Sequence, residues 1–425
     1  MNVLLLGSGG REHCIYWKIL NSPLLDEIYV YPGNGGILEE HRVRKEQYGD
    51  FFSDSFKNLI QFIDKKEIDL VIVGPEQPLV EGIADILKNH CLVFGPSKEG
   101  AKIEGSKSWA RNFMKQFGLP SANYQTFTNS KEAKEYIKTI NPPYVIKADG
   151  LAAGKGVSVV SNIEEANQIL TEILDKKIFG SAGDTILIEE FLEGKEASVF
   201  AFCDGTKALI MQPARDYKRA YDKNLGPNTG GMGSLSPVEY IDQELLDYIQ
   251  KEIFDKAIYG FQQLGISYKG ILYAGLMIHN YKAKIVEFNC RFGDPETQVL
   301  LPLLKEDLLE LCYQTAIGKI NTNKISFKEQ SALGVVIAAE GYPQNYKKNI
   351  NLTNFLKQVP QDLIVFHAGT EFMPSSNEFY STGGRILNFV SLGNSIEENQ
   401  KKIYDFLNKF PLKGTFFRKD IGILY

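Results

Sequence analysis

The sequence predicts a multidomain chain of α/β and α+β class that opens with a doubly wound parallel sheet. Four short apolar runs occur early in the chain, at positions 2–6, 27–31, 69–73 and 91–94, with helical stretches between them. Strands that alternate with helices are typical of a parallel sheet covered on both faces. The 425 residues allow about three domains. A Ser-, Asn- and Lys-rich passage at 321–330 predicts a linker before a small strand-rich module at 332–425.

The carboxyl ends of the early strands carry turns at 7–11, 33–36 and 74–77, the edge at which parallel sheets bind ligands. The first turn, GSGGRE at 7–12, resembles a dinucleotide fingerprint, but its third glycine would fall on Glu12. Pro32 and Gly33 stand where a ribose-binding acid is expected, which disfavours a nicotinamide-dependent oxidoreductase. We expect either a turn whose amides hold an anion at a helix N-terminus or a purely structural turn.

The middle of the chain mixes both kinds of element. Helical patterns end at breakers such as Gly118-Leu119-Pro120, while short apolar runs flanked by glycines indicate strands. The patterns predict helices at 107–117, 163–174 and 244–264, and strands at 144–147, 157–160, 185–190, 271–278 and 284–288.

Composition excludes several classes of protein. The formal net charge of -5 provides no general basic field for nucleic acid. No segment approaches the roughly 20 apolar residues of a membrane span. The five cysteines are scattered without a Cys-x-x-Cys pair, which indicates reduced thiols in a cytoplasmic protein rather than a zinc site.

The segment KADGLAAGKGV at 147–157 carries two lysines, Lys147 and Lys155, in a glycine-rich loop between two strands. Glycines let a backbone approach phosphate oxygens, and lysines neutralise their charge. The Walker spacing is absent. We therefore expect a phosphate-binding loop of another kind, with a solvated hairpin as the alternative.

Two further segments are weaker signals. ILIEEFLEGKE at 186–196 predicts a strand and turn that can offer backbone groups to a purine and a carboxylate to ribose, although acidic turns are usually just solvated. GPNTGGMG at 226–233 has too many glycines for a packed element, so it predicts either a ligand-contacting loop or a mobile surface loop.

EFNCRFGDPE at 287–296 is the strongest chemical pattern. Residues i and i+2 of a strand share a face, so Glu287 and Asn289 point the same way, with Cα atoms about 7 Å apart. Their oxygens suit magnesium, and phosphates can complete its octahedron. Arg291 can grip a carboxylate or phosphate, and Asp294 can bind an ammonium group. An exposed edge strand with one ion pair is the alternative.

In the order of its motifs the whole chain resembles the phosphoribosylamine–glycine ligases (glycinamide ribonucleotide synthetases), a family of the ATP-grasp superfamily. GPNTGGMG and RFGDPETQ are the motifs most specific to this family. The others are LLLGSGGREH, VGPEQPLV, KADGLAAGKGV, IEEFLEGKEAS, FHAGT, STGGRIL and FRKDIG.

The resemblance implies a central ATP-grasp domain in which the nucleotide lies between two α+β subdomains, one of them a lid. It implies domains at 1–102, 103–328 (lid about 123–192) and 329–425. The implied reaction joins glycine to 5-phosphoribosylamine in de novo purine biosynthesis, through glycyl phosphate, with ATP as co-substrate and Mg²⁺ or Mn²⁺ as cofactor. Partners would be these small molecules, with no nucleic acid and no membrane, in a cytoplasmic monomer or weak homodimer.

The resemblance also implies residue roles. Glu287 and Asn289 would bind the metal, and Arg291 and Asp294 would be catalytic. ATP would contact Lys147, Lys155, Glu189, Phe191, Leu192 and Glu196. The glycine, amine and phosphoribosyl groups would contact Gly9, Gly10, Glu76, Asp216, Asn228, Thr229, Gly230 and Gly231.

One departure from the family pattern concerns Asp222-Lys223-Asn224, where relatives often carry Asp-Gly-Asp. Asn224 therefore puts in doubt any carboxylate role at that position. Another ATP-grasp carboxylate–amine ligase and a non-enzymatic ATP-binding module remain the alternatives.

Overall fold

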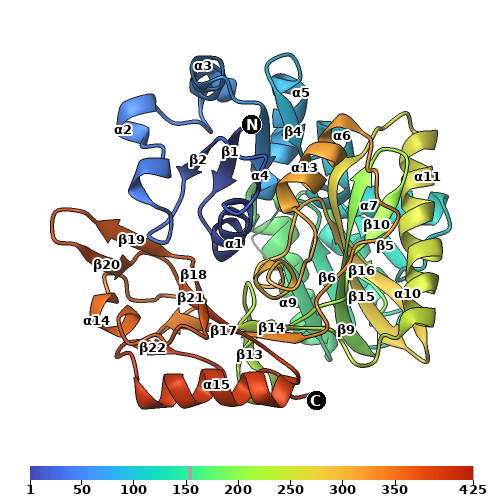
Figure 1. Ribbon diagram of the computed structural model, residues 1–425. Helices are drawn as coiled ribbons and strands as arrows, with labels where there is room; N and C mark the ends of the chain where they lie inside the picture. Colours follow the sequence, from blue (N-terminus) through green and yellow to red (C-terminus); the bar gives the residue numbers. More distant parts are fainter. Residues whose placement is uncertain (152–155, 425) are drawn as a thin grey trace.

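The computed structural model describes residues 1–151 and 156–424. The molecule contains four main sheets: an N-terminal sheet, the sheet of the lid, a central antiparallel sheet and a C-terminal sheet (Figure 1). This arrangement confirms the predicted α/β and α+β class. Within the described ranges no helix is long and apolar enough to cross a membrane.

The N-terminal sheet is parallel, in the order β2-β1-β3-β4. All four predicted strands form within a residue of their expected bounds; the apolar side chains of β1 and β3 are buried, whereas Leu92 and Val93 of β4 are partly exposed. The elements of this unit are β1 (Asn2–Gly7), α1 (Gly10–Ile19), β2 (Glu27–Pro32), α2 (Lys45–Tyr48), α3 (Lys57–Lys66), β3 (Leu70–Val73), α4 (Glu76–Glu81), α5 (Ile83–Leu87), β4 (Leu92–Phe94) and α6 (Lys98–Gly105).

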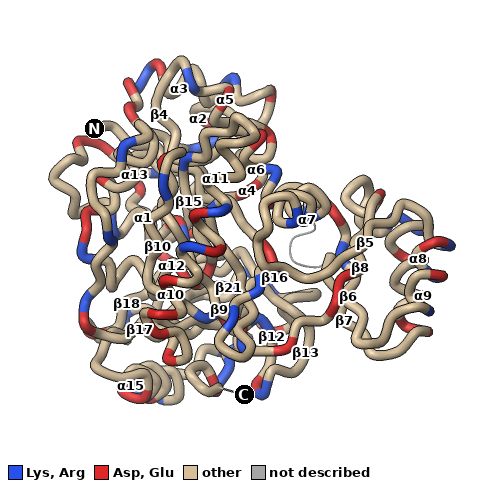
Figure 2. Tube along the Cα trace, turned by 90° about the vertical axis from the view of Figure 1, so that its right-hand side faces the viewer, with Lys and Arg blue, Asp and Glu red and all other residues tan. Residues whose placement is uncertain are grey.

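The lid is a four-stranded antiparallel sheet, β5-β8-β6-β7, which projects to one side of the molecule with its two helices (Figure 2). It has a hydrophobic cluster of its own, drawn from residues 127–188. Helix α7 (Lys107–Gln116) precedes it. Its elements are β5 (Tyr124–Phe127), α8 (Ser130–Ile137), β6 (Tyr144–Ala148), β7 (Val157–Val160), α9 (Ile163–Leu170) and β8 (Ile186–Glu189).

The central sheet is antiparallel, in the order β10-β9-β15-β16. The helix predicted at 244–264 consists of two α-helices joined by a π-helical turn at Gln250–Asp255. The elements are β9 (Lys195–Asp204), β10 (Ala208–Ile210), α10 (Gln243–Ile249), α11 (Lys256–Gln263), β15 (Lys269–His279), β16 (Lys282–Asn289), α12 (Thr297–Leu300) and α13 (Leu308–Ile317).

The C-terminal sheet, β11-β14-β17-β21-β18 with β22 beside β17, takes two strands from the middle of the chain. β11 and β14 flank the glycine-rich segment, whose first half pairs as β13 with β12. The elements are β11 (Arg215–Asp216), β12 (Arg219–Tyr221), β13 (Leu225–Asn228), β14 (Gly233–Ser236), β17 (Ser331–Ala339), α14 (Thr353–Leu356), β18 (Ile364–His367), β19 (Thr370–Met373), β20 (Glu378–Ser381), β21 (Arg385–Gly393), α15 (Ile396–Lys409) and β22 (Thr415–Phe416).

Candidate active site

The predicted metal residues lie at the end of β16. Glu287 is half-buried, and its carboxylate makes no hydrogen bond or ion pair with any residue of the described ranges. Asn289 is 8% exposed. The strand partner of Glu287 is Gly275, where an added Cβ would lie 3.3 Å from the Glu287 Cγ. The absence of a side chain opposite Glu287 therefore leaves its carboxylate room to hold a cation.

A β-bulge sets the direction of these side chains. Along β15 the partners step from Glu287 directly to Ile285, so Val286 is the extra residue. Ile285 and Phe288 are three residues apart, yet both belong to the same hydrophobic cluster. In a regular strand they would point to opposite faces. The bulge thus reverses the alternation and turns Glu287 and Asn289 away from that core.

A buried charge cluster lies beside the metal strand. Glu189, at the end of lid strand β8, forms an ion pair with Lys147 of β6 at 2.8 Å and with Arg111 of α7 at 2.7 Å. Burial raises the pKa of Glu189, but the two cations outweigh it and hold that pKa below its usual value. Burial also lowers the pKa of Lys147, against the opposing effect of Glu189. Two of the residues predicted to bind nucleotide, Lys147 and Glu189, therefore meet, together with an arginine that the sequence did not reveal.

Lys107 is a second cation that sequence reasoning missed. It is the first residue of α7, and its Nζ donates to the Gly150 carbonyl at 3.0 Å. Burial lowers the pKa of Lys107. The Glu287 carboxylate opposes this fall, and the Lys147 ammonium group adds to it. A cation at a helix N-terminus opposes the helix dipole, so this lysine needs another reason to stand there. A lysine at the predicted start of a helix is therefore the sequence signal that could have identified Lys107.

Asp216, Glu196 and Lys218 form a second charged group. Lys218 pairs with Glu196 at 2.9 Å and lies 3.9 Å from Asp216. Burial raises the pKa of Asp216 to about 7, in spite of Lys218 and with help from Glu296, Glu196 and Glu287. Asp216 thus sits among several carboxylates and titrates near neutrality.

Arg291 is held between two carboxylates. It pairs with Glu76 at 3.2 Å and with Glu104 at 2.7 Å, while its Nη2 lies 3.4 Å from the Asn289 Oδ1. Burial raises the pKa of Glu104, and Arg291 opposes that rise. Glu104 also accepts the backbone N–H of Cys290 at 2.8 Å. These contacts fix the C-terminal end of the metal strand against the N-terminal unit, and Glu104 was not predicted.

The N-terminal turn is partly filled by the protein itself. The Glu12 carboxylate accepts the Gly9 amide at 2.6 Å and the Arg11 Nε at 2.5 Å. A Cβ added at Gly74 would lie 2.1 Å from the Glu12 Oε1. Glu12 therefore occupies the place that a dinucleotide pyrophosphate would need. A Cβ at Gly9 would also lie 2.9 Å from the Asp294 Oδ2, so the turn and Asp294 are neighbours.

Arg385, in the STGGRIL segment, joins three distant parts of the chain. Its Nη1 donates to the Gly230 carbonyl at 2.6 Å and to the Asp294 carbonyl at 2.8 Å, and it lies 3.3 Å from the Asp294 Oδ1. The Gly230 amide donates to the Tyr342 hydroxyl at 3.0 Å. Thr229 binds the Lys218 carbonyl through its hydroxyl at 2.8 Å. The glycine-rich segment is therefore anchored on both sides.

Some predicted residues lie apart from these contacts. Phe191 is 43% exposed, and Asn228 is also exposed. Leu192 is partly exposed, and Lys155 lies outside the described residues. Asn224 accepts a hydrogen bond from Arg418 at 3.1 Å, so in this chain the position contacts the C-terminal segment rather than the metal strand.

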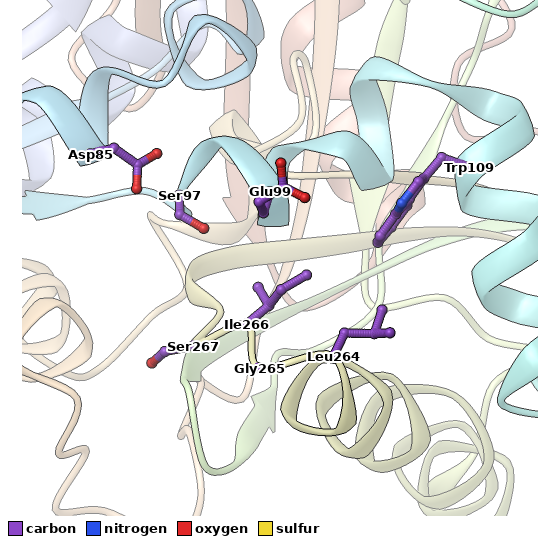
Figure 3. Close-up of a pocket in the computed structure, with 8 residues that line it drawn as sticks. All are labelled: Asp85, Ser97, Glu99, Trp109, Leu264, Gly265, Ile266 and Ser267. Carbon is purple, nitrogen blue, oxygen red and sulfur yellow. The ribbon is translucent and has the colours of Figure 1, made fainter.

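A surface hollow of about 520 Å³ lies elsewhere, between α6, α7 and the loop before β15 (Figure 3). No predicted site residue lines it. Its charged groups are Asp85 and Glu99, which repel phosphates. The candidate active site is therefore the junction of the motifs, where lysines lie near the unpaired carboxylate of Glu287.

Comparisons with known proteins identify the family of this chain. Residues 1–104, 105–297 and 332–423 match the N, ATP-grasp (A) and C domains of the phosphoribosylglycinamide synthetase family. A phosphoribosylamine–glycine ligase of Caldanaerobacter subterraneus subsp. tengcongensis is 42% identical over 100% of both chains. One of Leptospira interrogans is 45% identical over 99% of this chain and 98% of its own.

A solved structure supports the same assignment. The phosphoribosylamine–glycine ligase of Thermotoga maritima superposes with a TM-score of 0.85 at 33% identity, over 99% of this chain and 100% of that one. Because all three domains match and full-length identity exceeds 40%, the chain belongs to the phosphoribosylglycinamide synthetase family, whose members are ligases with the ATP-grasp fold.

Proposed function

We propose that this chain joins glycine to 5-phosphoribosylamine, forming N1-(5-phosphoribosyl)glycinamide, ADP and phosphate in de novo purine biosynthesis. One observation carries the proposal at the level of this chain. The unpaired carboxylate of Glu287 lies close enough to two lysines, the buried Lys147 and the partly buried Lys107, to oppose the fall in pKa that burial causes in each. Such a pairing of a free anion with two largely desolvated cations suits a metal–triphosphate complex.

The nucleotide would lie between the lid and the central sheet. Lys107, Lys147 and Lys155 would neutralise its phosphates. Phe191 and Leu192 would frame the adenine. Glu189 would accept a hydrogen bond from the adenine amino group through carboxylate lone pairs that Arg111 and Lys147 do not use. Glu196 would hold the ribose. Partial exposure of the base-framing side chains is consistent with a site that the nucleotide completes.

The donor set fits a hard divalent ion, Mg²⁺ or Mn²⁺. Glu287 and Asn289 would hold it, and phosphate and water oxygens would take the remaining positions. Across the described ranges no three His, Cys, Asp or Glu side chains form a metal cage. Two protein ligands plus substrate phosphates is the usual magnesium arrangement. When bound, the ion neutralises charge as two anions approach.

The remaining residues would bring the substrates together. Attack of the glycine carboxylate on the γ-phosphate gives glycyl phosphate and ADP, and the ribosylamine nitrogen then displaces phosphate. Asp294 would hold the glycine ammonium group, and Arg291 would orient the carboxylate. Asp216 is the carboxyl best suited to take the proton that the amine releases, because its pKa of about 7 matches that task. The remaining contacts would come from Gly9, Gly10, Glu76, Asn228, Thr229, Gly230 and Gly231.

The test is ADP release with 5-phosphoribosylamine and one carboxylic acid at a time. Glycine is expected to support turnover, whereas formate and bicarbonate leave the rate at background. Glu287→Gln should lower kcat by about 10²-fold or more, because loss of one preorganised charge-stabilising group commonly costs that much. Glu244→Gln, an exposed carboxylate on α10, is the control. Equal rates with glycine and bicarbonate would contradict the substrate assignment.

We further propose domain limits at 1–102, 103–328 and 329–425, with the lid at about 123–192, supported by the separate hydrophobic cluster of the lid. A cytoplasmic location is supported by the five cysteines, each of which is a free thiol. We propose a monomer or weak homodimer that acts only on small molecules.

A further inference from the structure

Arg111 connects three elements that converge at the candidate active site. It belongs to α7, is 2% exposed, and forms a two-pronged contact with Glu189 of lid strand β8, at 2.8 and 2.7 Å. The same guanidinium donates to two carbonyls of metal strand β16, those of Ile285 at 3.0 Å and Val286 at 2.7 Å. Every nitrogen of this side chain therefore serves either the lid or the metal strand.

The β-bulge leaves the backbone carbonyl of Val286 outside the hydrogen-bond ladder between β15 and β16. Its residue has no partner on β15, and its oxygen accepts hydrogen bonds from both Arg111 and Lys147, the latter at 3.2 Å. A bulge leaves backbone groups outside the ladder, and buried ones need partners. Arg111 thus supports the irregularity that turns Glu287 and Asn289 out of the core.

The charges around Glu189 suggest a second role. Two buried cations, Arg111 and Lys147, share one buried carboxylate. If Lys147 moves its ammonium group onto a nucleotide phosphate, Glu189 keeps a bidentate partner. Without Arg111, the same movement would leave a buried carboxylate without a counter-ion, which is strongly unfavourable. Lys147 would then stay paired with Glu189 and would not reach the phosphate.

We propose that Arg111 is a positioning residue for nucleotide binding: it supports the Val286 bulge and neutralises Glu189, so that Lys147 is free to engage phosphate. The proposal rests on the proposed function, in which Lys147 binds a phosphate. Arg111 itself contacts neither nucleotide nor metal in this scheme. It links the lid to the metal strand and acts through residues on each.

The chain offers a matched control for the link. Lys284 of β16 and Glu190, the residue after β8, form an ion pair at 2.7 Å, one residue away from Ile285 and from Glu189. Their side chains are 48% and 33% exposed. An exposed ion pair contributes little. Lys284→Met therefore removes a lid-to-strand contact without disturbing the buried cluster.

The experiment titrates Mg²⁺·ADP into each variant of the full chain by calorimetry. Arg111→Met should weaken binding by about tenfold or more, because a buried charge loses its partner. Arg111→Lys, which keeps the charge without the fork, should recover part of the loss. Lys284→Met should stay within about twofold of the parent. In turnover, the KM for ATP should rise in Arg111→Lys more than the KM for glycine does.

A double-mutant cycle separates the charge role from simple structural support. In a Glu189→Gln background no carboxylate retains Lys147, so adding Arg111→Met should cost much less affinity than it costs in the parent. An equal cost in both backgrounds would overturn the proposal, as would parent-like affinity in folded Arg111→Met. Lys147→Met distinguishes the two levels of inference. Loss of Mg²⁺·ADP affinity there, with none in Arg111→Met, refutes only the role of Arg111, whereas no loss in Lys147→Met refutes the phosphate site itself.

Discussion

Gly231→Ala tests whether the glycine-rich segment must lie tightly against the loop that carries Asp294. Gly231 has φ +110, and a Cβ added there would lie 2.3 Å from the Pro295 Cδ. Carbon atoms pack at about 3.5 Å, so either the glycine-rich segment or the loop that carries Pro295 must move by roughly 1 Å. The forbidden φ costs about 1–3 kcal/mol, and the forced packing costs a similar amount, about 1–3 kcal/mol. We expect a total loss of about 2–6 kcal/mol in unfolding free energy.

The same displacement should reach catalysis. Asp294 directly precedes Pro295, and a shift of about 1 Å can cost about 10²-fold in rate. We therefore expect kcat/KM for glycine, measured by ADP release, to fall by about that factor, with Mg²⁺·ADP affinity unchanged. Gly118→Ala is the control, because Gly118 has φ +66 and nothing within 4 Å of its added Cβ. Near-parent stability and activity of Gly231→Ala would refute the close packing of these two segments.

Three further predictions concern other parts of the chain. Lys107→Met should weaken Mg²⁺·ADP binding by about tenfold or more, as loss of a charged hydrogen bond does, while the exposed Lys102→Met should not; equal affinities would exclude Lys107 from the site. Arg385→Met removes the link between Gly230 and Asp294, so the KM for glycine should rise while Mg²⁺·ADP affinity stays constant; an unchanged KM would contradict this. Burial lowers the pKa of His13 to about 3 and that of His367 to about 4, from 6.5. The unfolded chain therefore binds more protons below about pH 6.5, and stability is lost as pH falls by about 1.4 kcal/mol per unit for each histidine. His13→Gln should reduce that slope between about pH 6 and 5 in denaturant titrations, and an unchanged slope would show that His13 does not carry it.

Local patterns were sufficient for most elements. The parallel strands at 2–6 and 27–31 and the strand at 157–160 form as predicted, because a short apolar run between turn residues has few alternatives. The shared face of Glu287 and Asn289 also follows from local geometry, since the two residues lie beyond the bulge. The family assignment followed from the order of motifs along the chain.

Other features depend on contacts between distant residues. β11 and β14 join the C-terminal sheet although both lie before the expected linker, and no local pattern indicates which sheet a short strand will join. Lys107 and Arg111 carried no recognised motif, because their importance comes from Asp149, Gly150 and Glu189 on the lid.

The sequence by itself determined the class of fold, the family, and the residue types available for phosphate and metal, because spacing and composition are local properties. Tertiary structure alone decided that Val286 bulges from its strand, that Glu12 fills the N-terminal turn, and that Arg385 ties Gly230 to Asp294. Strand register and long-range ion pairs arise from packing between segments up to hundreds of residues apart. No periodicity in the chain encodes them.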